Sequence, residues 1–125
     1  MVIAAFITGT NPTLEEVSDV KTAVSEAVTN SIIHGYRDKE GKVVINATVT
    51  GRKVYVEVID YGNGIEDVKK AMEPMYTTRP DEERSGMGFS FMEAFMDKLE
   101  VVSKPKEGTT VKMWKEIGAA GRQFE

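Results

Sequence analysis

Hydrophobic residues recur at helical spacing from Leu14 to about Ile33. The segment follows an Asn-Pro break, and Thr13 with Glu16 three residues later has the form of a capping box. Gly35 is a natural stop for such a helix. The pattern therefore predicts one long helix that begins at Leu14. Its core stripe is expected to consist of Leu14, Val17, Val20, Val24, Val28 and either Ser31 or Ile32.

The next two segments alternate between hydrophobic and polar residues, which is typical of half-buried strands. They cover residues 43–49 and 53–60, and Thr50-Gly51-Arg52 between them predicts a tight hairpin. In the second strand one face is expected to carry Val54, Val56 and Val58. A second hairpin is predicted from residues 99–102 and 110–114.

Residues 61–85 have weak periodicity, with one helical turn expected around residues 65–72. A loop of this length inside a compact domain is usually functional. Residues 87–96 predict another helix. The residues expected to face inward from it are Phe89, Met92, Phe95 and Met96.

The composition is that of a folded domain, since 41% of the 125 residues are hydrophobic and 29% are charged. This length fits one domain, covering residues 1–125, with a single core. The net charge of −4 and the absence of a dense Lys/Arg stripe argue against nucleic-acid binding, so a small molecule or a protein is the expected partner. The absence of cysteine excludes thiolate catalysis and cysteine zinc sites, and it fits a reducing, cytoplasmic location.

The apolar start of the chain, residues 1–7, is too short to span a bilayer and lacks the pattern of a signal peptide. We therefore expect no membrane association. The run is interpreted as the end of a core helix that lacks its own N-terminal cap, which indicates a missing upstream segment.

Three residues of the long helix are candidates for chemistry. Glu26, Asn30 and His34 are spaced four apart and so share one face, beside the small residues Ala23 and Ala27. Partial desolvation there would suit Glu26 as a base, and the amide oxygen of Asn30 would suit Mg²⁺. Taken alone, each is more often an ordinary surface residue of a helix, and His34 is interpreted as structural.

Two glycine-containing segments allow close approach of the backbone to a ligand. Asp60 ends a predicted strand and is followed by Gly62 and Gly64, so its carboxylate is placed to accept a hydrogen bond from the exocyclic amine of a ring. Gly86 and Gly88 open a predicted helix, where free N–H groups favour phosphate. Both segments, as well as Gly108-Thr109-Thr110, also fit a plain turn or a helix joint.

In this order, the segments at residues 26–34, 60–64, 84–89 and 108–110 resemble the boxes of the GHKL ATPase superfamily, which includes gyrases and histidine kinases. Residues 25–36, 75–80 and 83–89 further resemble the anti-sigma F factors, serine kinases of the sporulation switch in spore-forming bacteria. The resemblance extends from about residue 2 to residue 117.

The resemblance implies a role for each matching residue. Glu26 would be the general base, Asn30 the Mg²⁺ ligand, and Asp60 the residue that binds the adenine amine of ATP. Residues 65–85 would form the ATP lid. The other nucleotide-binding residues implied are Gly62, Gly64, Thr77, Thr78, Arg84, Ser85, Gly86, Met87, Gly88 and Thr109.

The implied fold is the Bergerat fold, a two-layer α/β sandwich with helices on one face of a mixed, mostly antiparallel sheet. ATP would bind between helix and sheet. The implied activity is phosphorylation of a serine on an anti-anti-sigma protein of the STAS type, together with sequestration of a sigma factor from RNA polymerase by a homodimer. Relative to the family, we expect the first strand and most of the first helix, which contribute to the dimer and to the sigma contact, to be missing.

Two alternatives remain open. One is the catalytic domain of a two-component histidine kinase, which is disfavoured because we find no phosphoacceptor histidine or dimerising hairpin ahead of the domain. The other is a module that binds nucleotide and sequesters a partner without transferring phosphate. The presence of Glu26 argues against it.

Overall fold

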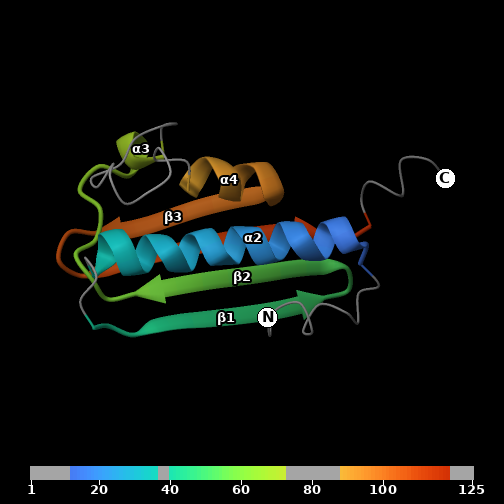
Figure 1. Cartoon of the computed structure of the whole chain (residues 1–125), viewed down its shortest axis with the longest axis horizontal. Helices are drawn as coiled ribbons and strands as arrows, with labels where there is room; N and C mark the ends of the chain where they lie inside the picture. Colours follow the sequence, from blue (N-terminus) through green and yellow to red (C-terminus); the bar gives the residue numbers. More distant parts are fainter. Residues whose placement is uncertain (1–11, 37–39, 73–87, 119–125) are drawn as a thin grey trace.

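The computed structural model describes residues 12–36, 40–72 and 88–118. Its strands form a four-stranded sheet in the order β1-β2-β4-β3, and all three pairings are antiparallel. Helices α2 and α4 lie on one face of this sheet (Figure 1). The elements in chain order are α2 (Leu14–Asn30), the π-turn η2 (Ser31–Gly35), β1 (Val43–Thr50), β2 (Lys53–Asp60), α3 (Val68–Ala71), α4 (Gly88–Phe95), β3 (Lys98–Lys104) and β4 (Gly108–Glu116).

The core lies between the helices and the inner face of the sheet. The period-two prediction for β2 is confirmed, since Val54, Val56 and Val58 are fully buried. Met92 in α4 and Met96, directly after this helix, are buried as predicted. The other buried hydrophobic residues in the described part of the chain are Val20, Ala23, Val24, Ala27, Val111, Met113 and Ile117. Burial of this apolar surface is the main stabilising contribution to the two-layer arrangement.

The predicted core stripe of α2 is partly wrong. Leu14 is 90% exposed because it begins the helix, ahead of the part that packs on the sheet. At the other end of the stripe Ser31 is buried and Ile32 is 47% exposed. Of these two alternatives, Ser31 is therefore the residue that faces the core. The Ser31 hydroxyl donates to the Ala27 carbonyl oxygen at 3.2 Å, which satisfies this buried polar group.

The long helix also ends differently from the prediction. Regular α-helix stops at Asn30, and the chain continues as a π-turn that is closed by the Tyr36 N–H donating to the Ser31 carbonyl oxygen at 2.9 Å. Single π-turns of this kind are rare in proteins overall, and those that occur are often found at functional sites. The π-turn carries His34 and brings Gly35 to the end of the sheet.

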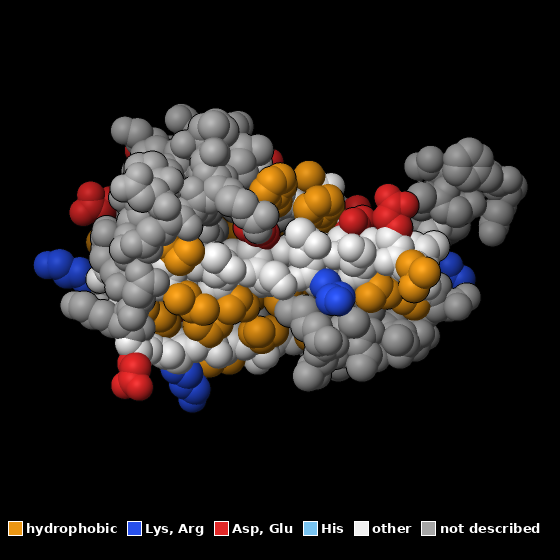
Figure 2. Space-filling model, viewed as in Figure 1, with side chains coloured by type: hydrophobic (Ala, Val, Ile, Leu, Met, Phe, Trp, Pro, Cys, Tyr) orange, Lys and Arg blue, Asp and Glu red, His pale blue; other side chains and the backbone are white. Residues whose placement is uncertain are grey.

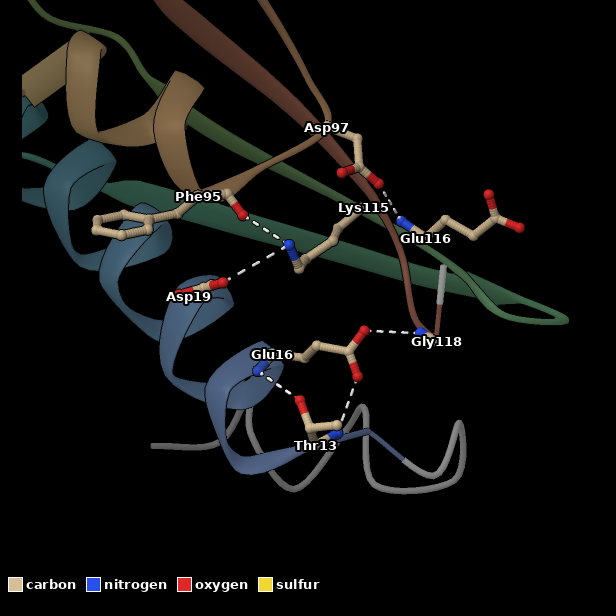
Figure 3. Close-up of polar contacts among 8 residues, drawn as sticks. All are labelled: Thr13, Glu16, Asp19, Phe95, Asp97, Lys115, Glu116 and Gly118. Carbon is tan, nitrogen blue, oxygen red and sulfur yellow. Dashed lines mark hydrogen bonds and ion pairs between the residues drawn. The ribbon is translucent and has the colours of Figure 1, made fainter. Parts of the chain in front are cut away.

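The predicted capping box is present and also ties α2 to the end of β4 (Figure 3). The Glu16 N–H donates to Thr13 Oγ1 at 3.0 Å, and Glu16 Oε1 accepts from the Thr13 N–H at 2.9 Å. The second oxygen, Oε2, accepts from the Gly118 N–H at 2.6 Å. Burial raises the pKa of Glu16, but the hydrogen bonds from Thr13 and Gly118 outweigh it, so the pKa lies below its usual value of 4.5.

Lys115 of β4 joins the two helices at this same end (Figure 3). Its Nζ donates to the Phe95 carbonyl oxygen at the C-terminus of α4, at 2.9 Å, and lies 3.8 Å from Asp19 Oδ2 on α2. A cation is favourable at a helix C-terminus, where carbonyl groups lack helical partners. Lys115 thus holds α2, α4 and β4 together.

Hydrophobic side chains form a band beside α2, over β1 and β2 (Figure 2). On the inner face of β1, Val43, Ala47 and Val49 pack against the core, but Ile45 is 45% exposed. The helices therefore cover β2 and β4 more fully than they cover β1. The predicted apolar helix end at residues 1–7 lies outside the described residues.

Candidate functional site

The inner face of the sheet ends in a row of polar residues. Asp60 of β2 is paired with Thr109 of β4, and Thr109 is paired with Ser103 of β3. Directly paired residues in an antiparallel ladder have their side chains on the same face. The preceding row on this face is apolar, so the polar row marks the point where the core ends. Asp60 is 5% exposed and Thr109 is 8% exposed.

Asp60 is held by the turn that follows it and is covered by the end of the long helix. Its Oδ1 accepts from the Gly62 N–H at 3.0 Å. A Cβ atom on Gly35 would lie 3.0 Å from this same oxygen, so glycine is the residue that lets the π-turn approach the carboxylate. Within the described residues, the Gly62 N–H is the one hydrogen-bond donor to the Asp60 carboxylate.

The glycines after Asp60 are required by close backbone contacts within the protein. A Cβ atom on Gly62 would lie 2.2 Å from the Gly35 carbonyl oxygen, and one on Gly64 would lie 2.0 Å from the Lys104 carbonyl oxygen. Gly64 also has a φ of 70°, which side chains rarely adopt. The Asn63 N–H donates to the Gly35 carbonyl oxygen at 2.7 Å. The turn is thus wedged between the helix end and the β3–β4 hairpin.

Tyr36 has a structural role that the sequence pattern did not predict. Its hydroxyl accepts from the Tyr61 N–H at 2.8 Å and donates to the Lys42 carbonyl oxygen. Tyr36 therefore connects the π-turn with the residue next to Asp60 and with the chain that enters β1. The available signal was its position directly after Gly35, within the segment at residues 25–36 that resembles the anti-sigma F factors.

Ser103 was also missed. Its hydroxyl accepts from the Ile65 N–H at 2.7 Å, lies 2.8 Å from Thr109 Oγ1, and donates to the Gly108 carbonyl oxygen at 3.0 Å. The predicted strand at residues 99–102 stopped one residue short of it. The alternation of the strand was the available signal, because Leu99, Val101 and Ser103 follow one another at every second position on the inner face.

The three candidate residues lie in the last turns of α2 and in the π-turn that follows and reaches Asp60. Glu26, Asn30 and His34 are each partly buried, which agrees with the expectation that this face is not a plain solvated surface. The predicted neighbours Ala23 and Ala27 are fully buried in the core. Asn30 is the last residue of regular helix before the π-turn.

These residues could bind Mg²⁺ only together with other ligands, such as water and substrate phosphates. Among the described residues no group of three His, Cys, Asp or Glu side chains could hold a metal by itself. Mg²⁺ commonly keeps several waters and takes one or two protein oxygens together with substrate phosphates. The Asn30 amide fits that smaller contribution.

Gly88 is the first residue of α4, as predicted for the start of this helix. The other residues predicted to bind the phosphates, and the lid beyond residue 72, lie outside the described residues. These predicted residues are Thr77, Thr78, Arg84, Ser85, Gly86 and Met87.

Comparison with known proteins gives the fold and the family. The family described as the histidine kinase-like ATPase domain matches residues 1–115. The anti-sigma F factor of Thermoanaerobacter sp. strain X514 is 58% identical over 118 residues, covering 94% of this chain and 82% of the relative. That of Clostridium botulinum strain Eklund 17B is 58% identical over 116 residues, covering 92% and 81%. The chain belongs to the anti-sigma F factor family.

Solved structures show the same fold as this member of the anti-sigma F factor family. The catalytic domain of the histidine kinase ThkA aligns with a TM-score of 0.64 at 20% identity, covering 81% of this chain and 68% of that one. The histidine kinase domain of a blue-light activated kinase from Erythrobacter litoralis aligns with a TM-score of 0.61 at 23% identity, covering 83% and 46%. The fold class predicted from the resemblance is confirmed. No helix in the described part of the chain is long and apolar enough to cross a bilayer.

Proposed function

We propose that this chain is an ATP-dependent protein serine kinase that phosphorylates an anti-anti-sigma protein and sequesters a sigma factor from RNA polymerase. The observation that carries the proposal is the buried carboxylate of Asp60, held by the Gly62 N–H beneath Gly35. This arrangement presents an acceptor at the junction of helix and sheet, which suits an adenine amine. The high identity to anti-sigma F factors supports the choice of substrate and partner.

The proposed roles are those that the resemblance implies, and the placement of Asp60 and Thr109 at the end of the sheet supports them. Asp60 and Thr109 bind the base at the end of the sheet, while Glu26 on α2 accepts the proton of the attacking serine hydroxyl. Asn30 contributes an oxygen to Mg²⁺, which when bound neutralises charge on the phosphates. Phosphoryl transfer depends mainly on positioning and charge stabilisation, so a site with few reactive side chains is sufficient.

Residues 65–85 are proposed as the lid over the nucleotide, with Gly62 and Gly64 shaping the turn ahead of it. The phosphate end is assigned to residues 84–88. The proposal includes a cytoplasmic location, because RNA polymerase and its sigma factors are the targets of the anti-sigma activity. It also includes a homodimer, which the resemblance implies.

The first experiment is calorimetric titration of the chain with ATP and ADP, with and without Mg²⁺, followed by phosphotransfer to a STAS-type anti-anti-sigma protein. Magnesium-dependent ATP binding and acid-stable phosphoserine on the acceptor are expected. Glu26→Gln should abolish transfer and leave ATP affinity within about three-fold, since the amide keeps the shape of the side chain but not its basicity.

Two results would contradict parts of the proposal. Transfer that survives in Glu26→Gln would remove Glu26 as the base. ATP binding without any transfer by the unmodified chain would favour a module that only sequesters its partner. The fold is shared with histidine kinases, so an acid-labile phosphohistidine product would instead favour that class.

A further inference from the structure

The turn at residues 61–65 is held by the β3–β4 hairpin as well as by the end of the long helix. The Asn63 carbonyl oxygen accepts from the Lys106 N–H at 2.6 Å. The next residue, Gly64, approaches the Lys104 carbonyl oxygen so closely that a Cβ atom on it would lie 2.0 Å away. Both contacts are made by backbone atoms of the hairpin. The conformation of the hairpin therefore helps to set the position of the turn.

The hairpin backbone has an unusual conformation at this contact. In the described part of the chain, Lys106 is the one non-glycine residue with a positive φ, at 68°. Residues 104–107 have the pattern of a type II turn, since Pro105 stands second and the Glu107 N–H donates to the Lys104 carbonyl oxygen at 3.0 Å. The third position of such a turn usually takes glycine. A lysine keeps this conformation only where surrounding contacts maintain it.

Ser103 adds a side-chain contact to the same joint between hairpin and turn. Its hydroxyl accepts from the Ile65 N–H at 2.7 Å and donates to the Gly108 carbonyl oxygen at 3.0 Å. It also lies 2.8 Å from Thr109 Oγ1. A hydroxyl has one proton to donate and two lone pairs that accept, so these three partners use its full capacity. The hydroxyl thus joins Ile65 to the first two residues of β4.

We propose that Ser103 is a positioning residue for the nucleotide site, because its hydroxyl fixes the residue at which the proposed lid begins. The inference rests on the proposed ATP binding. Ile65 is the first residue of the segment 65–85, which is proposed to cover the nucleotide. One end of that segment is then in place before the nucleotide binds. Less conformational entropy is lost on binding when part of a site is ordered in advance.

The proposal predicts which kinetic constant depends on the Ser103 hydroxyl. The contact to Ile65 is made by protein groups alone, so it supports the bound nucleotide equally before and during phosphoryl transfer. Loss of such a uniform contribution raises KM and leaves kcat unchanged. A purely structural role predicts the opposite result. Partial unfolding lowers the amount of active enzyme, and hence the apparent kcat, without changing the KM of the molecules that stay folded.

The first test measures ATP affinity by calorimetry and KM and kcat by phosphotransfer, both with the full chain. In Ser103→Ala the affinity for ATP should fall, and the KM should rise, by about five-fold, with kcat within about two-fold of the unmodified value. Ser103→Thr keeps the hydroxyl on a residue that suits a strand, so it should restore the KM. Val102→Ala is the matched control on β3, because Val102 is 47% exposed on the opposite face, and its KM should be unchanged.

The second test measures amide hydrogen exchange by NMR in the chain without nucleotide. Exchange at the Ile65 amide should be about five-fold or more faster in Ser103→Ala, because its hydrogen-bond acceptor is lost. The amides of Val56 and Val58 lie in the central strand β2 and should keep their rates. Equal acceleration at all three amides would show that the whole protein is destabilised.

Three results would overturn the inference. They are an unchanged KM in folded Ser103→Ala, a lower kcat with the same KM, and exchange at Ile65 that accelerates no more than exchange in β2. If the alanine variant does not fold, Ser103→Cys replaces it, since a thiol is a weak acceptor of similar size and should also raise the KM. Failure of the unmodified chain to bind ATP would contradict the proposed function, and this inference with it.

Discussion

The turn after Asp60 lies so close to the end of the long helix that a Cβ atom on Gly62 would be 2.2 Å from the carbonyl oxygen of Gly35. The Asn63 N–H donates to that same oxygen at 2.7 Å. The contact is between two backbones, so no side-chain rotation can relieve it. The position of Gly35 therefore sets the position of the Asp60 turn.

We expect Gly62→Ala to displace this turn and to destabilise the protein by about 1–3 kcal/mol, as overpacking in a tight interior does. ATP affinity should fall by about ten-fold, because the Gly62 N–H that orients Asp60 moves with the turn. Urea unfolding and titration with ATP measure the two effects. Gly51→Asn is the control, since Gly51 has a φ of 61° with open space around it and asparagine tolerates that conformation. An alanine variant with unchanged affinity would show that the turn can shift without cost to the site.

Tyr36→Phe should lower the free energy of unfolding by about 1–2 kcal/mol. The ring is kept, but the Tyr61 N–H and the Lys42 carbonyl oxygen both lose the hydroxyl that joins them. Chemical denaturation measures the difference. Tyr61→Phe removes a hydroxyl from a side chain that is 62% exposed and should have no measurable effect. Equal stability of the Tyr36 and Tyr61 variants would contradict a structural role for the Tyr36 hydroxyl.

The lowered pKa of Glu16 predicts a pH dependence of stability. Because the folded-state pKa lies below the usual value of 4.5, ionised Glu16 stabilises the folded state above that value. This contribution should be lost as the pH falls from 4.5 through the lower, folded-state pKa. The stability difference between the unmodified protein and Glu16→Gln should therefore shrink as the pH is lowered through this window, which thermal unfolding at a series of pH values can measure. Glu15→Gln, on the exposed side of the same turn, is the control. A difference that grows on acidification would contradict the assignment.

Lys115→Met should destabilise the protein by about 1–2 kcal/mol. Methionine retains much of the apolar stem but leaves the Phe95 carbonyl oxygen without the Nζ donor and Asp19 without its cation. The side chain of Lys115 is only 12% exposed, so water replaces the ammonium group poorly. Lys53→Met, on an exposed position of β2, is the matched control for loss of charge. Similar unfolding midpoints for the two variants would show that Lys115 does not join the helices energetically.

The sequence by itself determined most elements of the described fold and the position of Asp60 in it. The capping box at Thr13, the alternation in β2 and the inward position of Met92 in α4 are all predicted from residues close together in the chain. Caps and periodicity express local geometry, so they need no knowledge of the fold. The placement of Asp60 at the end of a strand followed for the same reason.

Only the tertiary structure decided which of these residues meet. Ser103 joins Thr109 because β3 and β4 pair in one register, and Asp60 joins Thr109 because β4 lies beside β2 in the sheet. The exposure of Leu14 depends on where α2 begins relative to the sheet, and the need for glycine at Gly62 depends on where the π-turn ends. Contacts between segments distant in sequence are set by strand order and packing, which local patterns do not encode.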